Sequence, residues 1–402
     1  MIDNYITNML EEIASCSESG QGVTRLPFSK EHRLAVAKIT EWMQNTGLSV
    51  HMDASGTLIG RREGPANSPT LLFGSHQDTV RHGGKYDGIM GVLLPILALQ
   101  KIGKQKLPYS VQVMAFADEE GVRFPTALIG PRALAGNFDN SALNFTDHNG
   151  VSVKEAMIKF GLNPDNIPSL DIRNTPIIGY VETHIEQGPV LDDKQSPLGI
   201  VTAIAGIERH QIKLRGISGH AGTIPMDVRH DTLACAAELV LIAEKIANDT
   251  PDLIATIGKI NVSPNAVNVI PGECSMVLEI RSAVDKTRIN NSKIIIEKMR
   301  NAALNRSIEF MCNKTYFQAA KPCDTRLQSV LKKAASVQNL DPIYLPSGAT
   351  HDASAMSELC PMAMLFVRCH RGISHTPEEF AKETDMQSAV ECLVEFMKLL
   401  KQ

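Results

Sequence analysis

The chain has 402 residues, and because single hydrophobic cores stop growing at roughly 250 to 300 residues, two domains are expected. Hydrophobic residues make up 43% of the chain and charged residues 21%, close to the globular average, which excludes disorder as its main state. Forty Lys and Arg against 44 Asp and Glu give a net charge of -4 with no basic cluster, so nucleic acid is not an expected partner.

The sequence indicates neither a membrane protein nor an exported one. Its apolar runs are well short of the roughly 20 residues that a membrane-spanning helix needs. The N-terminal stretch carries acids early and has no basic leader, so no signal peptide is expected. Eight cysteines are scattered without a Cys-x-x-Cys pair, which fits reduced thiols. We therefore expect a cytoplasmic protein.

The first 60 residues predict two helices followed by a hairpin. Apolar positions recur at helical spacing in residues 5–15 and 32–46, and residues 48–61 alternate around Ser55-Gly56. Four later segments are short, almost wholly apolar runs that end in polar residues: 70–74, 110–117, 177–182 and 362–367. With a helical stretch at 91–102 between the first two, these runs predict an α/β sheet with its sites at the carboxyl ends of the strands.

The segment 208–318 has a different pattern. It reads as strand, helix, strand, strand, helix and strand, which is the split βαβ order of a ferredoxin-like unit. The predicted elements are 210–215, 232–247, 255–262, 275–282, 286–305 and 307–313. We expect an inserted second domain at 208–318, with the first domain formed by residues 1–207 and 319–402 and ending in a helix at 384–400.

Acids and histidines gather where the apolar runs end. His76 and Asp78 follow the first run, and Asp87 lies in a glycine-rich loop before the next helix. The other three ends carry Asp118, Glu119 and Glu120, then Glu182, His184 and Glu186, and then His375. Each histidine taken alone would more often be a structural residue, but the repetition at four strand ends favours a metal site.

The residue types suit a pair of divalent ions. Consecutive carboxylates at 118–120 are costly without a cation to balance them. An imidazole with carboxylates at each of two centres, sharing one bridging carboxylate, is a ligand set that Zn²⁺ or Mn²⁺ accepts. Two such ions can activate one water molecule between them.

Eight motifs resemble those of the hydantoinase/carbamoylase family of amidases. In chain order they are GSHQDTV (74–80), GGKYDGIMGV (83–92), ADEEGVRF (117–124), ETHIEQGPVL (182–191), GISGHAGTIPMDVRHD (216–231), NVIPG (268–272), GATHDA (348–353) and GISHTPEE (372–379). The family holds N-carbamoyl-L-amino acid and allantoate amidohydrolases within the aminoacylase and carboxypeptidase-type dinuclear metallohydrolases. The resemblance covers nearly the whole chain and implies a mixed-sheet α/β metallohydrolase domain with an inserted ferredoxin-like α+β lid and dimerisation domain.

The resemblance implies two divalent ions per subunit, of Zn²⁺, Mn²⁺, Co²⁺ or Ni²⁺. His76 and His184 match the ligands of one ion, Glu120 and His375 those of the other, and Asp87 the bridging carboxylate. Two further acids have implied catalytic roles: Glu119 matches the general base, and Asp78 the acid that orients His76.

The resemblance also implies a substrate site. Arg281 matches a residue that grips the substrate carboxylate, which suits its planar fork, and His220 and Asn268 match groups that reach over from the partner subunit to bind substrate and stabilise the oxyanion. Gln187, Gly348 and Ala349 match contacts to the polar end of the substrate; of their neighbours, His351 and Asp352 are expected to be structural, and His82 to lie at the surface. Where the family commonly has a second glycine, this chain has Thr350, which bears on specificity.

The expected reaction is hydrolysis of the ureido C–N bond of an N-carbamoyl-L-amino acid to the L-amino acid, carbon dioxide and ammonia, by a homodimer paired through the inserted domain. Allantoate stays open as the substrate, and an aminoacylase or peptidase activity is a weaker alternative. The chain lacks a Gly-x-Ser-x-Gly elbow and a phosphate-binding glycine loop, and no cysteine stands in a polar strand-end motif. A homologue that only binds ligand is disfavoured because every ligand position is present.

Overall fold

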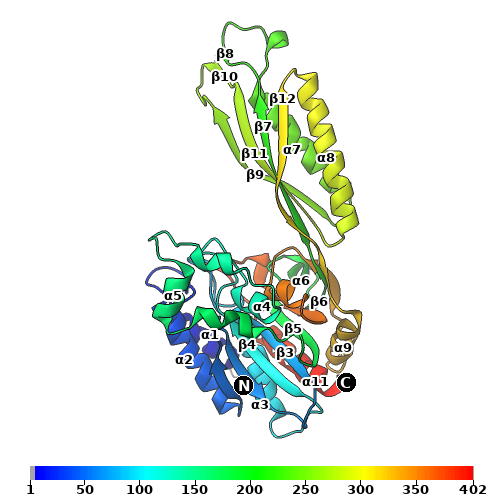
Figure 1. The fold of residues 1–402 in the computed structure, drawn as a ribbon. Coiled ribbons are helices and arrows are strands. Elements are labelled where there is room, and N and C mark those ends of the chain that lie inside the picture. Colours follow the sequence, from blue (N-terminus) through cyan, green and yellow to red (C-terminus); the bar gives the residue numbers. More distant parts are fainter. Residues whose placement is uncertain (1–4, 402) are drawn as a thin grey trace. The chain divides into compact units, whose positions relative to one another are not determined.

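The computed structural model describes residues 5–401, which form two compact units (Figure 1). The first unit comprises the chain up to Thr202, Cys323–Leu345 and the residues from Ala349 on. The second unit comprises Ala203–Pro322 and Pro346–Gly348. The predicted boundaries at 208 and 318 both lie inside this second unit.

The first unit is built on a mixed sheet in the order β1-β2-β4-β3-β5-β15-β6-β13, with β14 also paired to β6. The strands are β1 (Ser49–Met52), β2 (Leu58–Arg62), β3 (Thr70–His76), β4 (Ser110–Phe116), β5 (Ile177–Ile185), β6 (Leu198–Ile204), β13 (Lys321–Pro322), β14 (Ile343–Ser347) and β15 (Met362–Val367). Strands β4, β3, β5 and β15 run parallel to one another. Their carboxyl ends therefore meet at one edge of the sheet, where α/β proteins place their sites.

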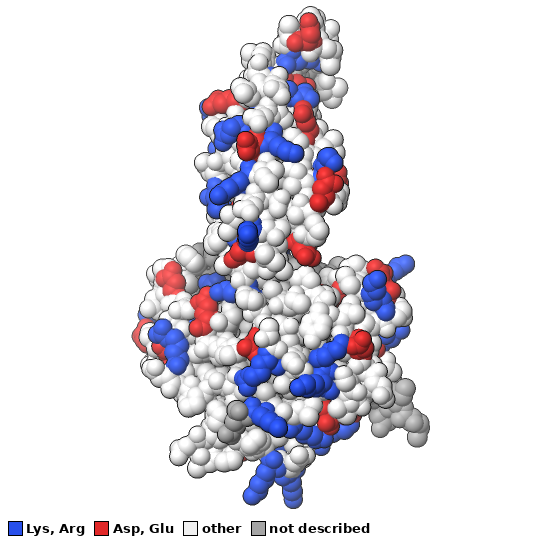
Figure 2. All heavy atoms as spheres, turned by 90° about the vertical axis from the view of Figure 1, so that its right-hand side faces the viewer, with Lys and Arg blue, Asp and Glu red and all other residues white. Residues whose placement is uncertain are grey.

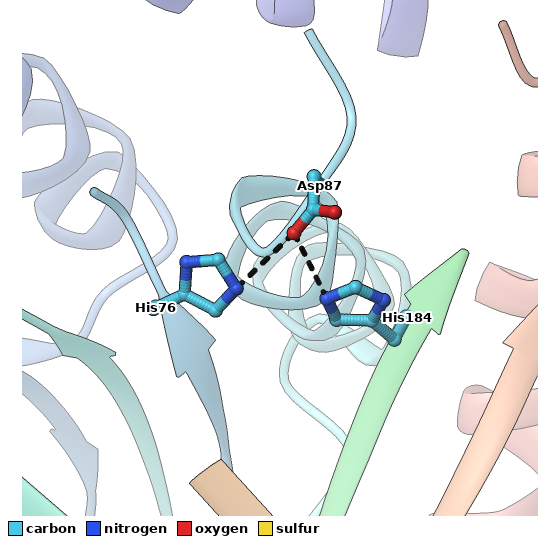
Figure 3. A group of neighbouring side chains, drawn as sticks. All are labelled: His76, Asp87 and His184. Atoms are coloured by element: carbon cyan, nitrogen blue, oxygen red, sulfur yellow. Dashed lines mark ion pairs between the residues drawn. The ribbon is translucent and has the colours of Figure 1, made fainter. Parts of the chain in front are cut away.

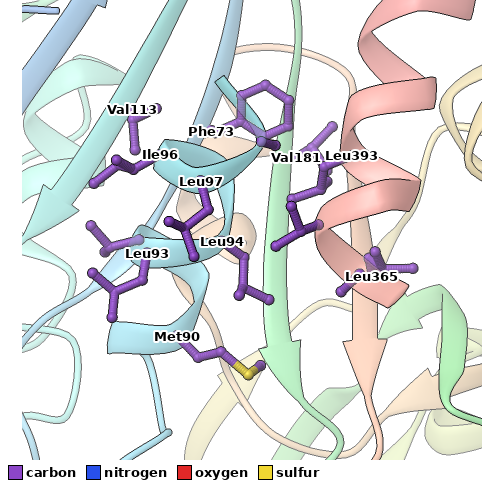
Figure 4. Close-up of a cluster of buried hydrophobic side chains, with 14 of the residues drawn as sticks. Phe73, Met90, Leu93, Leu94, Ile96, Leu97, Val113, Val181, Leu365 and Leu393 are labelled. Carbon is purple, nitrogen blue, oxygen red and sulfur yellow. The ribbon is translucent and has the colours of Figure 1, made fainter. Parts of the chain in front are cut away.

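One large core covers a face of this sheet. It is formed with α1 (Tyr5–Ala14), α2 (Lys30–Asn45), α3 (Ile89–Ile102), α9 (Thr325–Ser336) and α11 (Glu383–Leu399). Helix α3 has 12 of its 14 residues buried, as expected of a helix that is apolar on all sides. Figure 4 shows its Leu94 and Leu97 among side chains of the central strands and of α11, including Val181 and Leu393. Burial of each such side chain contributes roughly 1.5–3 kcal/mol.

The remaining helices of the first unit are short. They are α4 (Ile129–Leu134), α5 (Val153–Phe160), α6 (Val190–Asp193) and α10 (Asp352–Met356), with 3-10 turns at Asn140–Asn144, Pro164–Leu170 and His370–Gly372. Helices α4 and α5 share a second, smaller core with Phe28 and Phe124. This core holds the chain that follows β4, which carries Glu119 and Glu120.

The second unit is a four-stranded antiparallel sheet with two helices. Its elements are β7 (Gly206–Arg215), α7 (Thr232–Asn248), β9 (Leu253–Ser263), β11 (Glu273–Ser282), α8 (Asp285–Asn305) and β12 (Glu309–Gln318). The strand order is β12-β7-β11-β9, and both helices pack on the sheet over a separate core. β8 (Gly219–His220) and β10 (Val269–Ile270) form a small ribbon, and a 3-10 turn covers Met226–Val228. On the face in Figure 2, acidic and basic side chains are interspersed over this unit.

Three predicted strand ends were wrong. β3 continues to His76 instead of ending at residue 74, so His76 is its last residue and does not follow it. β5 continues to Ile185 instead of ending at residue 182, so His184 lies within the strand and does not follow it. The polar residues at its end are buried, which conceals the strand from an apolar-run criterion. β12 runs to Gln318 instead of ending at residue 313. The prediction stopped too early because the later residues of the strand are mostly exposed and polar. Among the described residues, no helix is long and apolar enough to cross a bilayer.

Candidate metal centre

Two imidazoles and one carboxylate meet at the carboxyl edge of the sheet. His76 is the last residue of β3, His184 lies near the end of β5, and Asp87 lies in the loop that enters α3. Figure 3 shows the two rings turned toward the Asp87 carboxylate. Asp87 Oδ1 lies 3.2 Å from His76 Nε2 and 3.2 Å from His184 Nε2. All three residues are buried.

The other ring nitrogen of each histidine is fixed by a backbone carbonyl. His76 Nδ1 lies 2.9 Å from the carbonyl oxygen of Asp78, and His184 Nδ1 lies 2.9 Å from that of Ile185. A carbonyl can only accept, so each Nδ1 must carry the proton and donate it. In the neutral form of each ring, which is the form that binds a metal, the Nε2 lone pair faces Asp87; in the protonated form, Nε2–H donates to Asp87 instead.

A second group forms on the other oxygen of the same carboxylate. Asp87 Oδ2 lies 3.5 Å from His375 Nε2, and Glu120 Oε1 lies 3.7 Å from that same nitrogen. Glu120 Oε1 is buried and accepts no hydrogen bond from any described residue. A buried carboxylate oxygen without a donor is costly unless a cation faces it.

Three sets of ligand atoms each fall within 4.8 Å of one another: His76, Asp87 and His184; Asp87, Glu120 and His375; and His76, Glu119 and Glu120. The first two sets share Asp87, which offers one oxygen to each. Nitrogen and carboxylate oxygen are donors that Zn²⁺ and Mn²⁺ accept. The residues present therefore fit two divalent ions bridged by Asp87.

The charges at this edge need a cation to balance them. Burial raises the pKa of Glu119 well above its usual range, and the neighbouring carboxylate of Glu120 adds to the effect. Burial and the charge of Asp87 raise the pKa of Glu120 to about 7. Burial would also raise the pKa of Asp87, but His184 and hydrogen bonds from three imidazoles hold it well below its usual range. Divalent ions would relieve the repulsion among the three carboxylates.

Asp78 connects two of the strand ends. The backbone N–H groups of Glu119 and Glu120 donate to its two carboxylate oxygens over 3.1 Å and 3.2 Å. Asp78 Oδ1 also lies 3.7 Å from His76 Nδ1. This fully buried carboxylate therefore fixes the Glu119-Glu120 turn, while the predicted role of the Asp78 side chain in orienting His76 stays a prediction.

The side chain of Gln187 contacts the same centre. Its Nε2 donates to Asp87 Oδ2 over 2.6 Å and lies 3.4 Å from His375 Nε2. Gln187 adopts a left-handed backbone conformation with φ 57°, which is uncommon for a residue with a side chain and frequent at functional sites.

The predicted groups His220, Asn268, Arg281 and Gly348 belong to the second unit. The backbone N–H of Ala221 donates to the Asn268 carbonyl over 2.9 Å, so the His220 and Asn268 loops lie side by side. Arg281 on β11 pairs with Glu279 over 2.7 Å, and its Nη1 donates to the Gly348 carbonyl. Arg281 and Gly348 are therefore in contact, while Ala349 belongs to the first unit.

The structure also places the four neighbouring residues for which the sequence predicts no catalytic role. His351 is buried, and its ring packs at 4.5 Å against that of His184 in an edge-on arrangement. Asp352 is buried too, and burial raises its pKa well above the usual range. His82 is exposed, with Nδ1 3.1 Å from the Gln21 carbonyl. Thr350 is partly exposed.

The sequence did not single out Ser374 and Glu379, which both touch the Asp87 region. Ser374 Oγ lies 3.0 Å from Asp87 Oδ2, and Glu379 accepts the backbone N–H of Asp87 over 3.0 Å. Glu379 stands beside Glu378 in the same motif, and only the structure distinguishes the buried acid from the exposed one.

The sequence and the fold are similar to those of known hydrolases. Residues 72–399 match the peptidase family M20/M25/M40. An N-carbamoyl-L-amino acid amidohydrolase of Geobacillus stearothermophilus is 37% identical over 92% of each chain. An allantoate deiminase of Arabidopsis thaliana is 36% identical over 97% of this chain and 81% of its own. The crystal structure of a hydantoinase/carbamoylase family amidase from Burkholderia multivorans superposes with a TM-score of 0.92 at 28% identity, covering 98% and 97% of the two chains.

The chain thus belongs to the peptidase family M20/M25/M40. Within it, the chain is a hydantoinase/carbamoylase amidase, a hydrolase that acts on carbon–nitrogen bonds other than peptide bonds.

Proposed function

We propose that this protein hydrolyses the ureido C–N bond of an N-carbamoyl-L-amino acid. The observation that carries the proposal is the arrangement at Asp87, whose two oxygens face two separate groups of ligand atoms. His76 and His184 would hold one ion with Asp87, and Glu120 and His375 would hold the other. The N-carbamoyl-L-amino acid amidohydrolase relatives at 37% identity support the substrate class.

The chemistry needs a polarised carbonyl, an attacking water and a proton carrier, because a ureido carbonyl is a poor electrophile. Bound divalent ions supply polarisation and lower the pKa of water. Glu119 takes a proton from the attacking water, whose oxygen forms the new bond to the ureido carbon. The C–N bond to the amino acid then breaks, and Glu119 returns the proton to the leaving nitrogen. The carbamate released with the L-amino acid decomposes to carbon dioxide and ammonia.

Substrate binding is assigned to both units in this proposal. Arg281 would bind the substrate carboxylate through its fork, in exchange for part of its present pairing with Glu279. His220 would stabilise the oxyanion, and Asn268 would assist in holding the substrate. Gln187, Gly348 and Ala349 form the remaining contacts to the polar end.

Allantoate is the second candidate substrate, supported by the plant allantoate deiminases at 35–36% identity. Allantoate and N-carbamoyl amino acids both present a ureido group beside a carboxylate, so the same catalytic residues serve either one. The shape of the pocket decides between them, and Thr350 belongs to the loop that departs from the common family motif.

The test is an assay of the purified protein against a panel of N-carbamoyl-L-amino acids and allantoate, each with Mn²⁺, Co²⁺, Ni²⁺ and Zn²⁺. We expect turnover that is lost after treatment with a chelator and gel filtration, and restored by one of these ions. A kcat/KM highest for allantoate would select the second candidate. A protein that holds no divalent ion and hydrolyses none of these substrates would refute the proposal.

A further inference from the structure

We infer that Glu379 is a positioning residue that locks the loop of Asp87 to the loop of His375 through Ser374, and so sets the affinity of the ion held by Asp87, Glu120 and His375. The inference rests on the proposed dinuclear centre. It does not depend on which ureido substrate is hydrolysed.

Glu379 connects two loops that lie far apart in the sequence. Its Oε1 accepts the backbone N–H groups of Tyr86 over 2.9 Å and of Asp87 over 3.0 Å. Its Oε2 accepts the hydroxyl of Ser374 over 2.8 Å. Glu379 is only 4% exposed; its two contacts to the backbone are buried, and the contact to Ser374 is partly buried. A buried carboxylate with three donors around it fixes the backbone positions that supply them.

Ser374 links Glu379 to the Asp87 carboxylate. Its Oγ lies 3.0 Å from Asp87 Oδ2, the oxygen that faces Glu120 and His375. Its hydroxyl has one proton and lies between two carboxylates. Glu379 therefore contacts the backbone N–H of Asp87 directly and reaches the Asp87 carboxylate through Ser374, whose single proton can be donated to only one of the two carboxylates at a time. This second contact involves Asp87 Oδ2, the oxygen that faces Glu120 and His375.

The surrounding backbone is built tightly around this contact. A Cβ at Gly84 would lie 2.2 Å from Glu379 Oε1, so only glycine allows the Asp87 loop to approach. His375 adopts φ 59°, a left-handed conformation that costs of order 1–3 kcal/mol for a residue with a side chain. Such a conformation persists only where neighbouring contacts hold it, and Ser374 is the adjacent residue.

The experiment compares four variants with the wild type after the metal has been stripped by a chelator. Glu379→Ala removes all three contacts. Glu379→Gln keeps two acceptor bonds through its carbonyl and can donate its amide to Ser374. Ser374→Ala removes the hydroxyl, and with it the contacts to Asp87 Oδ2 and Glu379 Oε2, while the two backbone contacts of Glu379 stay. Glu378→Ala is the matched control, because it deletes the adjacent, exposed acid. Calorimetric titration with Mn²⁺ gives the two affinities, and elemental analysis after gel filtration gives the number of ions retained.

We expect Glu379→Ala and Ser374→Ala to weaken one of the two Mn²⁺ sites by about 10–100-fold, as is typical when a residue that orients a ligand is lost. Glu379→Gln and Glu378→Ala should bind both ions like the wild type. If Glu379→Ala does not fold, the Mn²⁺ affinities of Ser374→Ala and Glu379→Gln are compared with those of the wild type instead.

Two unchanged Mn²⁺ affinities in Ser374→Ala, or an equal loss of affinity at both sites, would overturn the inference. A Glu379→Gln variant that binds Mn²⁺ as weakly as Glu379→Ala would overturn it too. The result is separable from the proposed function. A wild type that binds two ions and hydrolyses no ureido substrate refutes the function, while the variants still report on Glu379.

Discussion

At the scale of single residues, Glu119 and Glu120 are adjacent acids with different proposed roles. Glu119→Gln should lower kcat by about 10²–10⁴-fold, the range lost with a general base, while the protein keeps its metal. Glu120→Gln is the matched comparison, since it should lose metal together with turnover. Steady-state kinetics and metal analysis of both variants check this pair. Full activity in Glu119→Gln would contradict the assignment of the base.

Arg281 provides a test of substrate binding that is independent of the metal centre. Arg281→Ala should raise KM by about 10–100-fold with a smaller change in kcat, because a hydrogen-bonded charge pair contributes about 1.5–3 kcal/mol. Arg209→Ala is the control, because Arg209 pairs with the same Glu279 and has no proposed contact to the substrate. An unchanged KM in Arg281→Ala would remove this residue from the substrate site.

The residues of the candidate site differ in how far the sequence could predict them. His76 stands out as a polar residue beside an apolar run, and Asp87 as an acid in a glycine-rich loop before an apolar helix; the structure places them in one group. Ser374 and Glu379 give no such signal. Their importance comes from contacts with Asp87, almost 300 positions away in the chain, which no local pattern records.

At the scale of elements, the central strands and the buried helix α3 follow from apolar runs in the sequence. Helices α5 and α9 were not predicted, although both carry local start signals. Ser152 and Glu155 form a capping box before α5, and the Asp324 side chain accepts the backbone N–H of Leu327 at the start of α9. Strand β6 was missed because its pairing with β15 and β14 depends on distant segments.

Helix α2 contains a buried histidine that should make the first unit sensitive to acid. His32 stacks on Phe160, and its Nδ1 accepts the backbone N–H of Phe28. Burial, with the nearby charges of Arg25 and Arg33, lowers the pKa of His32 to about 3. The unfolded chain, in which histidine titrates near 6.5, therefore binds the proton more readily. Stability from this residue is complete above pH 6.5 and is lost as the pH falls toward 3.

The expected loss at pH 5 is about 2 kcal/mol of unfolding free energy. In His32→Gln, the free energy of unfolding should fall by about 2 kcal/mol less between pH 7 and pH 5 than in the wild type, even if the variant is less stable at pH 7. The single tryptophan, Trp42, lies on α2, so its fluorescence during urea unfolding reports this unit. His148→Gln, at an exposed site, is the control. An identical decline in His32→Gln and wild type would contradict the prediction.

At the scale of the whole molecule, the length and the change of pattern near residue 208 predicted two domains, and the structure has two compact units. The roles expected of the second unit, a lid and a dimer interface, stay predictions. One feature supports pairing of two copies. β9 lies at the end of its sheet, and although Leu253 packs into the core, Ile254 and Ile260 are 56% and 45% exposed. An exposed apolar edge strand is a favoured site of association.

We therefore expect the protein to sediment as a homodimer of about twice 43.8 kDa. Ile260→Lys should shift it toward the monomer, because a charge on the edge strand opposes pairing. Leu304→Lys, which changes an exposed residue on α8, should leave the dimer intact. If His220 and Asn268 act on the partner's substrate, the monomeric variant should also lose turnover while it retains its metal. A fully active monomer would show instead that each chain completes its own site.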